Sequence, residues 1–268
     1  IQKIIKRVFP FEESIKLAYC PERILPGNLI KELIYNDRII GGTNAKSSNY
    51  VENFYKTIYK GNSFKCNSIT AELIKLAENS YRDLNIAFAN SLSLIAEKEK
   101  QNIEKIIKLA NHHPRVNILK PGIGVGGHCI PVDPWFLINK YPKETKLLFE
   151  ARQINKQKTY YVIKKIRNFI NKYNFKKSYC PRILCLGITY KENTDDTRDS
   201  ASLFIFKTLK KEFKNVLSYD PNLKNSFDKE RLIEIIKNSE IVIKLVNHKE
   251  FNKKTFKDLI NKKIVLEL

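Results

Sequence analysis

The sequence predicts an α/β protein that ends in a parallel sheet, and three observations lead to this prediction. Short apolar runs and amphipathic segments alternate with short links over residues 179–268, which is typical of parallel βαβ units. Residues 47–110 are helical in pattern almost throughout, and a further helical segment runs from Pro142 to about Tyr173. Residues 1–46 hold two short strands and two helical pieces, which make up only the end of an α/β unit.

The N-terminal elements come first in the chain. A charged helical piece precedes a strand at Ile15–Tyr19, a helix near Leu29–Tyr35 and a strand at Asp37–Gly42. A complete doubly wound domain has several more βα units, so we expect a missing portion before Ile1. The chain also has no methionine, not even at position 1, which indicates a fragment or an unusual translation start.

A long helix dominates the middle of the chain. It is expected to start at Ser68 or Thr70 as N-cap and to run to about Lys100. Its neighbours are expected to be a helix at Ser48–Lys60, a strand at Phe64–Asn67, and helices at Asn102–Ala110 and Lys143–Asn171.

Three polar residues share one face of this long helix. Lys75, Asn79 and Arg82 are spaced i, i+4 and i+7, so their side chains lie in one row. The spacing alone fits a ligand-binding face and a solvated polar stripe equally well.

Strands and helices alternate regularly in the C-terminal part. The expected strands are Arg182–Gly187, Asn215–Ser218, Ile241–Val246 and Lys263–Leu268, and the expected helices are Ala201–Phe213, Lys229–Asn238 and Lys254–Ile260. The last strand ends with the chain, so we expect a missing C-terminal piece as well.

Length and composition fit a folded protein of this kind. The chain has 268 residues, of which 43% are hydrophobic, enough for a sizeable core. It contains no apolar run long enough for a transmembrane helix, and its charged start does not resemble a signal peptide. The five cysteines have neither metal-site nor disulfide-framework spacing, which favours a reducing cytoplasm; they are Cys20, Cys66, Cys129, Cys180 and Cys185.

The formal charge of +21 raises the question of nucleic-acid binding. The lysines are spread along the whole chain among many Asn and Ile residues, as a biased genome composition would produce. No zinc-finger or RNA-binding signature accompanies them. We therefore expect no nucleic-acid or membrane partner, although a positive field would attract a phosphorylated substrate.

The stretch Lys120–Phe136 is the strongest candidate for a functional loop. It holds four of the nine glycines and the only tryptophan. Glycines let a backbone approach a ligand closely, and Cys129 at the end of the run, with Asp133 four residues later, suggests a presented thiol. An inert buried cysteine is the alternative, but the glycines and prolines disfavour a core strand or helix.

The same stretch contains a glycine pattern that resembles a dinucleotide fingerprint. Gly122, Gly124 and Gly127 match G-x-G-x-x-G, which requires a strand before it and a helix after it. Pro121 precedes this run, and Cys129-Ile-Pro131 follows it in place of a helix. The dinucleotide interpretation is therefore rejected at this position.

Six motifs, in this order and spacing, resemble the UDP-glucose/GDP-mannose dehydrogenase family over essentially the whole chain. They are Tyr19-Cys-Pro-Glu-Arg-Ile-Leu-Pro-Gly27, Asn36-Asp-Arg-Ile-Ile-Gly-Gly42, Ala71–Asp83, His113-Pro-Arg-Val116, Gly124-Val-Gly-Gly-His-Cys129, and Tyr190-Lys191 followed by Arg198-Asp-Ser200. The resemblance implies a Rossmann-like fold in four parts. These are the end of an NAD-binding domain (1–46), a central helical dimerisation domain with the Cys loop (47–141), a connecting helix (142–178) and a UDP-sugar-binding domain (179–268).

The resemblance also implies a reaction. Members of the family use two NAD+ to oxidise the C6 alcohol of a nucleotide sugar to a carboxylate, and these motifs are most similar to the branch that acts on UDP-N-acetyl-D-mannosamine. Cys129 would form the thiohemiacetal and thioester, and Lys75 would shuttle the alcohol proton and steady oxyanion charge. Asn79 would hold the same oxygen or a water, Asp133 would activate water or orient Lys75, and Glu22 would lie close to the chemistry.

The remaining matches imply binding roles. A homodimer is implied, with the long helix at residues 69–100 as its interface, and His113 and Arg115 would reach into the neighbouring subunit's site. Arg198 would contact NAD. The other residues implied to bind the UDP-sugar are Arg23, Ile24, Lys75, Asn79, Arg82, Gly126, Tyr190 and Lys191.

Two positions depart from the family pattern, and several alternatives stay open. Tyr190 stands where phenylalanine is frequent, and Glu192 where proline is frequent; neither change removes a catalytic group. UDP-N-acetylglucosamine and UDP-glucose are alternative substrates. A catalytically dead remnant that only binds UDP-sugar or dimerises is a further alternative.

Overall fold

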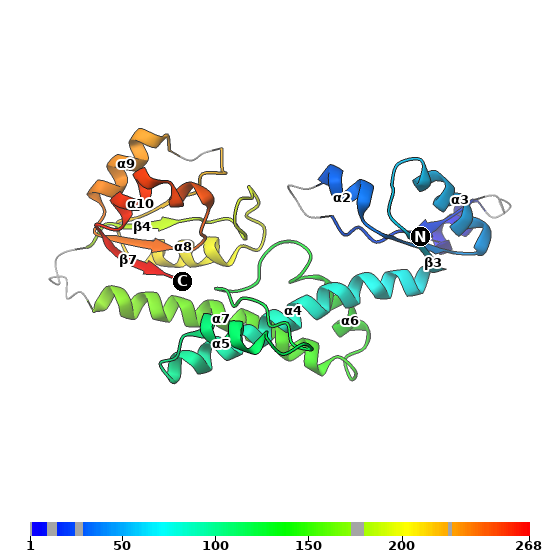
Figure 1. Ribbon diagram of the computed structural model, residues 1–268, viewed down its shortest axis with the longest axis horizontal. Helices are drawn as coiled ribbons and strands as arrows, with labels where there is room; N and C mark the ends of the chain where they lie inside the picture. The colour runs from blue at the N-terminus through cyan, green and yellow to red at the C-terminus, as the bar shows by residue number, and fades with distance from the viewer. Residues whose placement is uncertain (1, 10–14, 25–28, 173–179, 225–226) are drawn as a thin grey trace. The chain divides into compact units, whose positions relative to one another are not determined.

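The structure is a computed structural model that describes residues 2–9, 15–24, 29–172, 180–224 and 227–268 (Figure 1). The chain forms two compact units, Ile1–Glu78 and Asn79–Leu268. The end of the first motif and the end of the connection expected at 142–178 lie outside the described residues.

The first unit is built on a three-stranded sheet in the order β1 (Ala18–Tyr19), β2 (Arg38–Gly42), β3 (Ser63–Asn67). β1 is antiparallel to β2, whereas β2 and β3 are parallel and joined through α3 (Ala45–Lys56). The first strand is shorter than the expected Ile15–Tyr19, because only Ala18 and Tyr19 pair with β2.

Side-chain caps correct two of the expected helix starts in this unit. Asn44 accepts the N–H of Ser47 (2.8 Å), so α3 begins before the expected Ser48. Asn67 accepts the N–H of Thr70 (2.8 Å), so it caps α4 (Ser68–Lys98) in place of Ser68 or Thr70. The other helices of this unit are α1 (Gln2–Val8) and α2 (Leu29–Tyr35), the latter with the expected bounds.

The second unit opens with the rest of α4, followed by α5 (Ile103–Ala110), α6 (Asp133–Lys140) and α7 (Lys146–Asn171). α4 and α7 lie side by side, joined by the buried pair Asn90–Asn155 (Figure 1). α7 begins three residues after the expected Lys143, because Thr145 bonds back to the carbonyl oxygen of Tyr141 in a turn.

Helix α6 is a correction to the sequence prediction, which expected no helix after the glycine run. The carbonyl oxygen of Cys129 accepts the N–H groups of Val132 (3.0 Å) and Asp133 (2.8 Å), and Pro134 stands in the first turn, where proline is tolerated. The residues just before Gly122 form no strand, so the run still lacks the strand–turn–helix arrangement of a dinucleotide site.

The C-terminal part confirms the predicted parallel sheet. Its strand order is β5-β4-β6-β7, with all neighbours parallel. The strands are β4 (Ile183–Leu186), β5 (Val216–Tyr219), β6 (Ile241–Lys244) and β7 (Ile264–Glu267), and the helices are α8 (Ala201–Glu212), α9 (Lys229–Asn238), the 3-10 helix η1 (Lys249–Asn252) and α10 (Lys254–Ile260).

Two apolar clusters cover the two faces of this sheet. Ile183 and Cys185 of β4 pack into one cluster with residues of α7 and α8, whereas Leu184 and Leu186 pack into the other with α9 and α10. Alternate residues of a strand point to opposite faces, so a strand covered on both sides is apolar throughout. Among the described residues, no helix is long and apolar enough to cross a membrane. The same residues contain no cluster of three or more His, Cys, Asp or Glu side chains that could hold a metal ion.

Candidate active site

The glycine run of Lys120–Phe136 forms a loop that packs against the segment after β4. The N–H of Gly127 donates to the carbonyl oxygen of Arg198 (3.0 Å). Gly127 has φ +93°, and a Cβ there would lie 3.1 Å from the ring of Tyr190. A Cβ on Gly126 would lie 2.6 Å from the carbonyl oxygen of Asp199. Packing alone therefore requires glycine at both positions.

Cys129 stands at the end of the glycine run, four residues before α6 begins, and its side chain is half-buried. Burial raises the pKa of the Tyr190 hydroxyl. The neighbouring Asp196 and Cys129 raise this pKa further, whereas Arg198 and Arg82 lower it. The loop cysteine, Tyr190 and two arginines are thus electrostatic neighbours in the second unit.

A carboxylate holds Arg198 beside the loop. The guanidinium of Arg198 donates to both carboxylate oxygens of Asp196. These hydrogen bonds lower the pKa of Asp196 to about 2. His128 of the glycine loop lies 3.6 Å from the same carboxylate. Lys191, expected to bind substrate, is exposed.

Asn79 and Asp133 form a further polar pair in the second unit. Nδ2 of Asn79 donates to Oδ2 of Asp133 at 2.5 Å, and Asn79 is buried. Asp133 is the first residue of α6, so the pair joins α4 to the helix that begins four residues after Cys129.

Lys75, Glu22, Arg23 and Ile24 meet in the first unit. Nζ of Lys75 donates to the carbonyl oxygen of Glu22 (2.7 Å). The carboxylate of Glu22 accepts the N–H groups of Arg23 (2.7 Å) and Ile24 (3.0 Å), so it folds its own segment into a turn. Arg23 bonds the carboxylate of Glu78 through two nitrogens, a contact that sequence reasoning missed.

His113 and Arg115 lie on an exposed segment of the second unit. Nδ1 of His113 accepts the N–H of Arg115 (3.3 Å), and both residues are exposed. Their expected role in a neighbouring subunit stays a prediction.

A buried His–Asp pair supports the loop that carries Tyr190, and sequence reasoning missed it. Nδ1 of His248 accepts from the N–H of Asn193 and from Nδ2 of Asn222, both at 2.9 Å. Nε2 therefore carries the proton and donates to Asp220 (3.0 Å).

The Asp220 carboxylate also holds the start of the same loop. It accepts the N–H groups of Ile188 (2.8 Å) and Thr189 (3.1 Å). Burial alone would raise the pKa of Asp220, but the bonds from His248 and from backbone N–H groups outweigh it and lower the pKa. The sequence could have indicated these two residues by their position, because Asp220 and His248 each follow a predicted parallel strand, and nucleotide sites lie at the ends of such strands.

Three family models match consecutive parts of the chain. All belong to the UDP-glucose/GDP-mannose dehydrogenase family: its NAD binding domain at 1–59, its central domain at 69–157 and its UDP binding domain at 184–268.

Individual relatives agree with this match. The UDP-N-acetyl-D-mannosamine dehydrogenase of Campylobacter jejuni is 44% identical over 89% of this chain and 60% of its own length. An NDP-N-acetyl-D-galactosaminuronic acid dehydrogenase of Ralstonia nicotianae is 40% identical over 90% of this chain and 58% of its own length. The chain thus spans about 60% of the length of the curated relatives it matches.

Solved structures of the same kind share the fold. The UDP-D-ManNAc dehydrogenase of Pyrococcus horikoshii has 35% identity and a TM-score of 0.88, covering 99% of this chain and 64% of that one. The UDP-N-acetyl-mannosamine dehydrogenase of Staphylococcus aureus has 35% identity and a TM-score of 0.84, covering 100% of this chain and 67% of that one. The fold class and the resemblance expected from the motifs are confirmed, and the chain belongs to the UDP-glucose/GDP-mannose dehydrogenase family.

Proposed function

We propose that this chain supplies the nucleophile and the UDP-sugar site of an NAD-dependent dehydrogenase. The reaction is the four-electron oxidation of the C6 alcohol of UDP-N-acetyl-D-mannosamine to the carboxylate. The observation that carries the proposal is Cys129, half-buried two residues after Gly127, the glycine that packs on Tyr190 and donates to the carbonyl oxygen of Arg198. A thiol, unlike a hydroxyl, is nucleophilic enough to trap an aldehyde and still leave as a thiolate.

The described glycines of the first unit do not fit a pyrophosphate cradle. A Cβ on Gly41 would lie 2.4 Å from Ala71, and one on Gly42 would lie 2.2 Å from Ser48, so the chain itself fills the space beside both. NAD+, when bound, supplies an acceptor for the electron pair of each C6–H bond that breaks. The steps below are those that the residues of this chain perform.

In the first stage the alcohol becomes an aldehyde. Lys75 takes up the hydroxyl proton and stabilises the oxygen charge with Asn79. The two residues are one turn apart on the continuous helix α4, which supports a shared task.

In the second stage Sγ of Cys129 adds to the aldehyde carbon. The S–C bond forms, the carbonyl π bond breaks and the oxygen takes a proton, giving a thiohemiacetal. Loss of the second C6 hydrogen with its electron pair, together with loss of the hydroxyl proton, gives a thioester. Water then attacks the thioester carbon and the C–S bond breaks, releasing the carboxylate and the thiolate. Asp133, held by Asn79, is the candidate to take the water proton.

Sugar-nucleotide binding falls to residues around the same loop. We assign Tyr190, Lys191 and Arg82 to the substrate, since Tyr190 packs on the glycine loop and is an electrostatic neighbour of Arg82. Arg23 and Ile24 are also assigned to the substrate, and Arg198 is assigned to the cofactor. A cytoplasmic location fits the free state of all five cysteines.

Cys129→Ser in the full-length gene product tests the covalent step. With UDP-N-acetyl-D-mannosamine and NAD+, we expect carboxylate formation to fall by a factor of about 10³ or more, because a serine hydroxyl is not activated here. The measurement is NADH formation together with product mass.

Cys180→Ser is the matched control, since Cys180 is an exposed cysteine away from this loop. It should keep wild-type turnover. Wild-type turnover by Cys129→Ser would overturn the covalent role. Parallel assays with UDP-N-acetylglucosamine and UDP-glucose decide the sugar separately.

We infer that the enzyme is a homodimer formed through α4. Tyr81, Phe88 and Ile95 are 66%, 56% and 57% exposed and recur at a spacing of seven residues, as in the contact seam of paired helices. Such an apolar row on one face marks an interaction surface. His113 and Arg115 would then be contributed across the dimer.

Phe88→Glu tests this interface. Two buried charges in a two-fold contact would be destabilising, so we expect a monomer at micromolar concentration by sedimentation equilibrium, where the wild type is a dimer. Tyr160→Glu, at a 52% exposed position on α7, is the control and should stay dimeric. A dimeric Phe88→Glu protein excludes this face.

A further inference from the structure

A buried amide contacts the start of the glycine loop. Oδ1 of Asn90, on α4, accepts the N–H of Gly122 at 2.9 Å. Next along the loop, the carbonyl oxygen of Ile123 accepts from the hydroxyl of Thr159 on α7 (2.9 Å). These two contacts hold one end of the loop, and the Gly127–Arg198 bond holds the other.

The same asparagine is fixed from behind by a chain of buried polar groups. Nδ2 of Asn90 donates to Oδ1 of Asn155 (2.9 Å), and Nδ2 of Asn155 donates to the carboxylate (2.8 Å) and the carbonyl oxygen (3.0 Å) of Asp83. Arg152 completes the chain with an ion pair to Asp83 at 2.6 Å. Each amide uses its oxygen and its nitrogen on different partners, so neither can flip without breaking two bonds.

Because this network is buried, a polar group in it that lost its hydrogen-bond partner would destabilise the fold. Asn90, Asn155 and Asp83 are 0%, 1% and 1% exposed. Burial raises the pKa of the Asp83 carboxyl, opposed by Arg152 and Asn155. A buried polar group left without its partner costs about 1–3 kcal/mol, whereas a satisfied network specifies one arrangement of the elements that share it.

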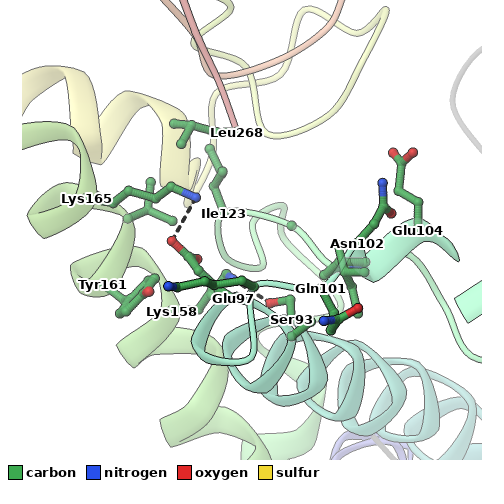
Figure 2. A pocket seen from close by; sticks show the side chains of 16 residues that line it. Ser93, Glu97, Gln101, Asn102, Glu104, Ile123, Lys158, Tyr161, Lys165 and Leu268 are labelled. Atoms are coloured by element: carbon green, nitrogen blue, oxygen red, sulfur yellow. Dashed lines mark hydrogen bonds and ion pairs between the residues drawn. The ribbon is translucent and has the colours of Figure 1, made fainter. Parts of the chain in front are cut away.

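A second contact secures the same turn of α4. The hydroxyl of Ser93 donates to the carbonyl oxygen of Asn90 (2.6 Å), and Nζ of Lys158 donates to that hydroxyl (2.6 Å). Ser93, Lys158 and Ile123 of the loop all line one cavity of about 510 Å³ (Figure 2). Both α4 and α7 therefore contact the start of the loop, and buried hydrogen bonds connect the two helices to each other.

We propose that Asn90 is a positioning residue for Cys129. Its side chain fixes the N–H of Gly122, and thereby the path of the loop that ends at the nucleophile, relative to α4 and α7. This inference rests on the proposed role of Cys129, since without it the network only orders a loop.

The test uses the 268-residue chain and needs no substrate. Asn90→Leu and Asn90→Ser both remove the acceptor for Gly122. We expect amide exchange at Gly122 to rise by about tenfold or more through local opening. We expect iodoacetamide to alkylate Cys129 about fivefold faster relative to the exposed Cys180, as read by peptide mass.

Two controls separate a loss of loop positioning from a general loosening of the fold. Cys185 is fully buried, and burial raises the pKa of its thiol to about 12, so it stays unmodified while the second unit is folded. Asp228→Ala removes the N-cap of α9, away from the loop, and should cost about 1 kcal/mol without changing the Cys129 rate.

In the full-length enzyme, Asn90→Ser should lower kcat by about a hundredfold while KM stays within about threefold, because misplacing the nucleophile impairs chemistry more than binding. Wild-type rates at Gly122 and Cys129 in a folded Asn90 variant overturn the proposal, as do equal increases in Asp228→Ala. An active Cys129→Ser enzyme would instead overturn the proposed function and leave the loop measurements standing.

Discussion

The two sheets of this chain are held together in different ways. In the C-terminal sheet, β4 is buried at every position and β6 at three of four, and apolar clusters cover both faces. In the N-terminal sheet, β3 is largely exposed, with Phe64 53% exposed. Apart from glycines, the buried apolar residues described for the first unit are Pro21, Ile40, Tyr59 and Ala71.

Charged groups take the place of an apolar core in the first unit. The carboxylate of Glu52 on α3 meets Lys56 (3.3 Å), Lys65 of β3 (3.0 Å) and the hydroxyl of Ser63. The guanidinium of Arg38 lies 4.7 Å from the ring centre of Tyr55 and donates to a backbone oxygen. We therefore expect the stability of the second unit to depend on buried apolar volume, and the stability of the first unit to depend on the protonation of its carboxylates.

Ile243→Ala should give the largest effect, because Ile243 lies in a cluster that joins β6 to α7 and α8. Removing a buried isoleucine side chain costs about 2–5 kcal/mol through lost burial and the cavity left behind. Trp135, the only tryptophan, lies in the second unit, so urea unfolding followed by its fluorescence reports this unit alone.

Leu217→Ala is the matched control for this prediction. Leu217 is 45% exposed on β5 of the same sheet, so its truncation should cost less than about 1 kcal/mol. Equal losses in the two variants would show that the buried cluster does not dominate the stability of this unit.

The same contrast decides how much of the fold could be predicted from the sequence. In the apolar C-terminal part, α9 and α10 match the expected helices to the residue, since continuous apolar runs alternate with clear turn signals. In the middle, α6 was missed, because its start depends on the carbonyl oxygen of Cys129 and not on a cap that a pattern could display.

The candidate site divides in a similar way. Chemistry-bearing residues such as Cys129, Asn79 and Asp133 stand out by type and spacing, and Asn79 does meet Asp133. Asn90 and Asn155 did not stand out, because they are 65 residues apart and a buried amide looks the same in sequence as an exposed one. Periodicity predicts which face is buried but not which polar groups find partners there.

Glu52→Gln should give a smaller effect that depends on pH and is confined to the first unit. Hydrogen bonds from Ser63 and Lys65 lower the pKa of Glu52 from 4.5 to about 2. A carboxylate with a depressed pKa contributes stability that is complete above the unfolded value and is lost as the pH falls through the folded value. The wild-type first unit should therefore lose stability between about pH 4.5 and 2, whereas Glu52→Gln is less stable at pH 7 and changes less over that range. Amide exchange of Ile40 in β2, relative to the intrinsic rate at each pH, measures this stability.

Glu72→Gln removes an exposed carboxylate of the same unit and should follow the wild type. If both variants follow the wild type, the charged cluster around Glu52 does not stabilise this sheet, and the contrast between the two units rests on the apolar core alone.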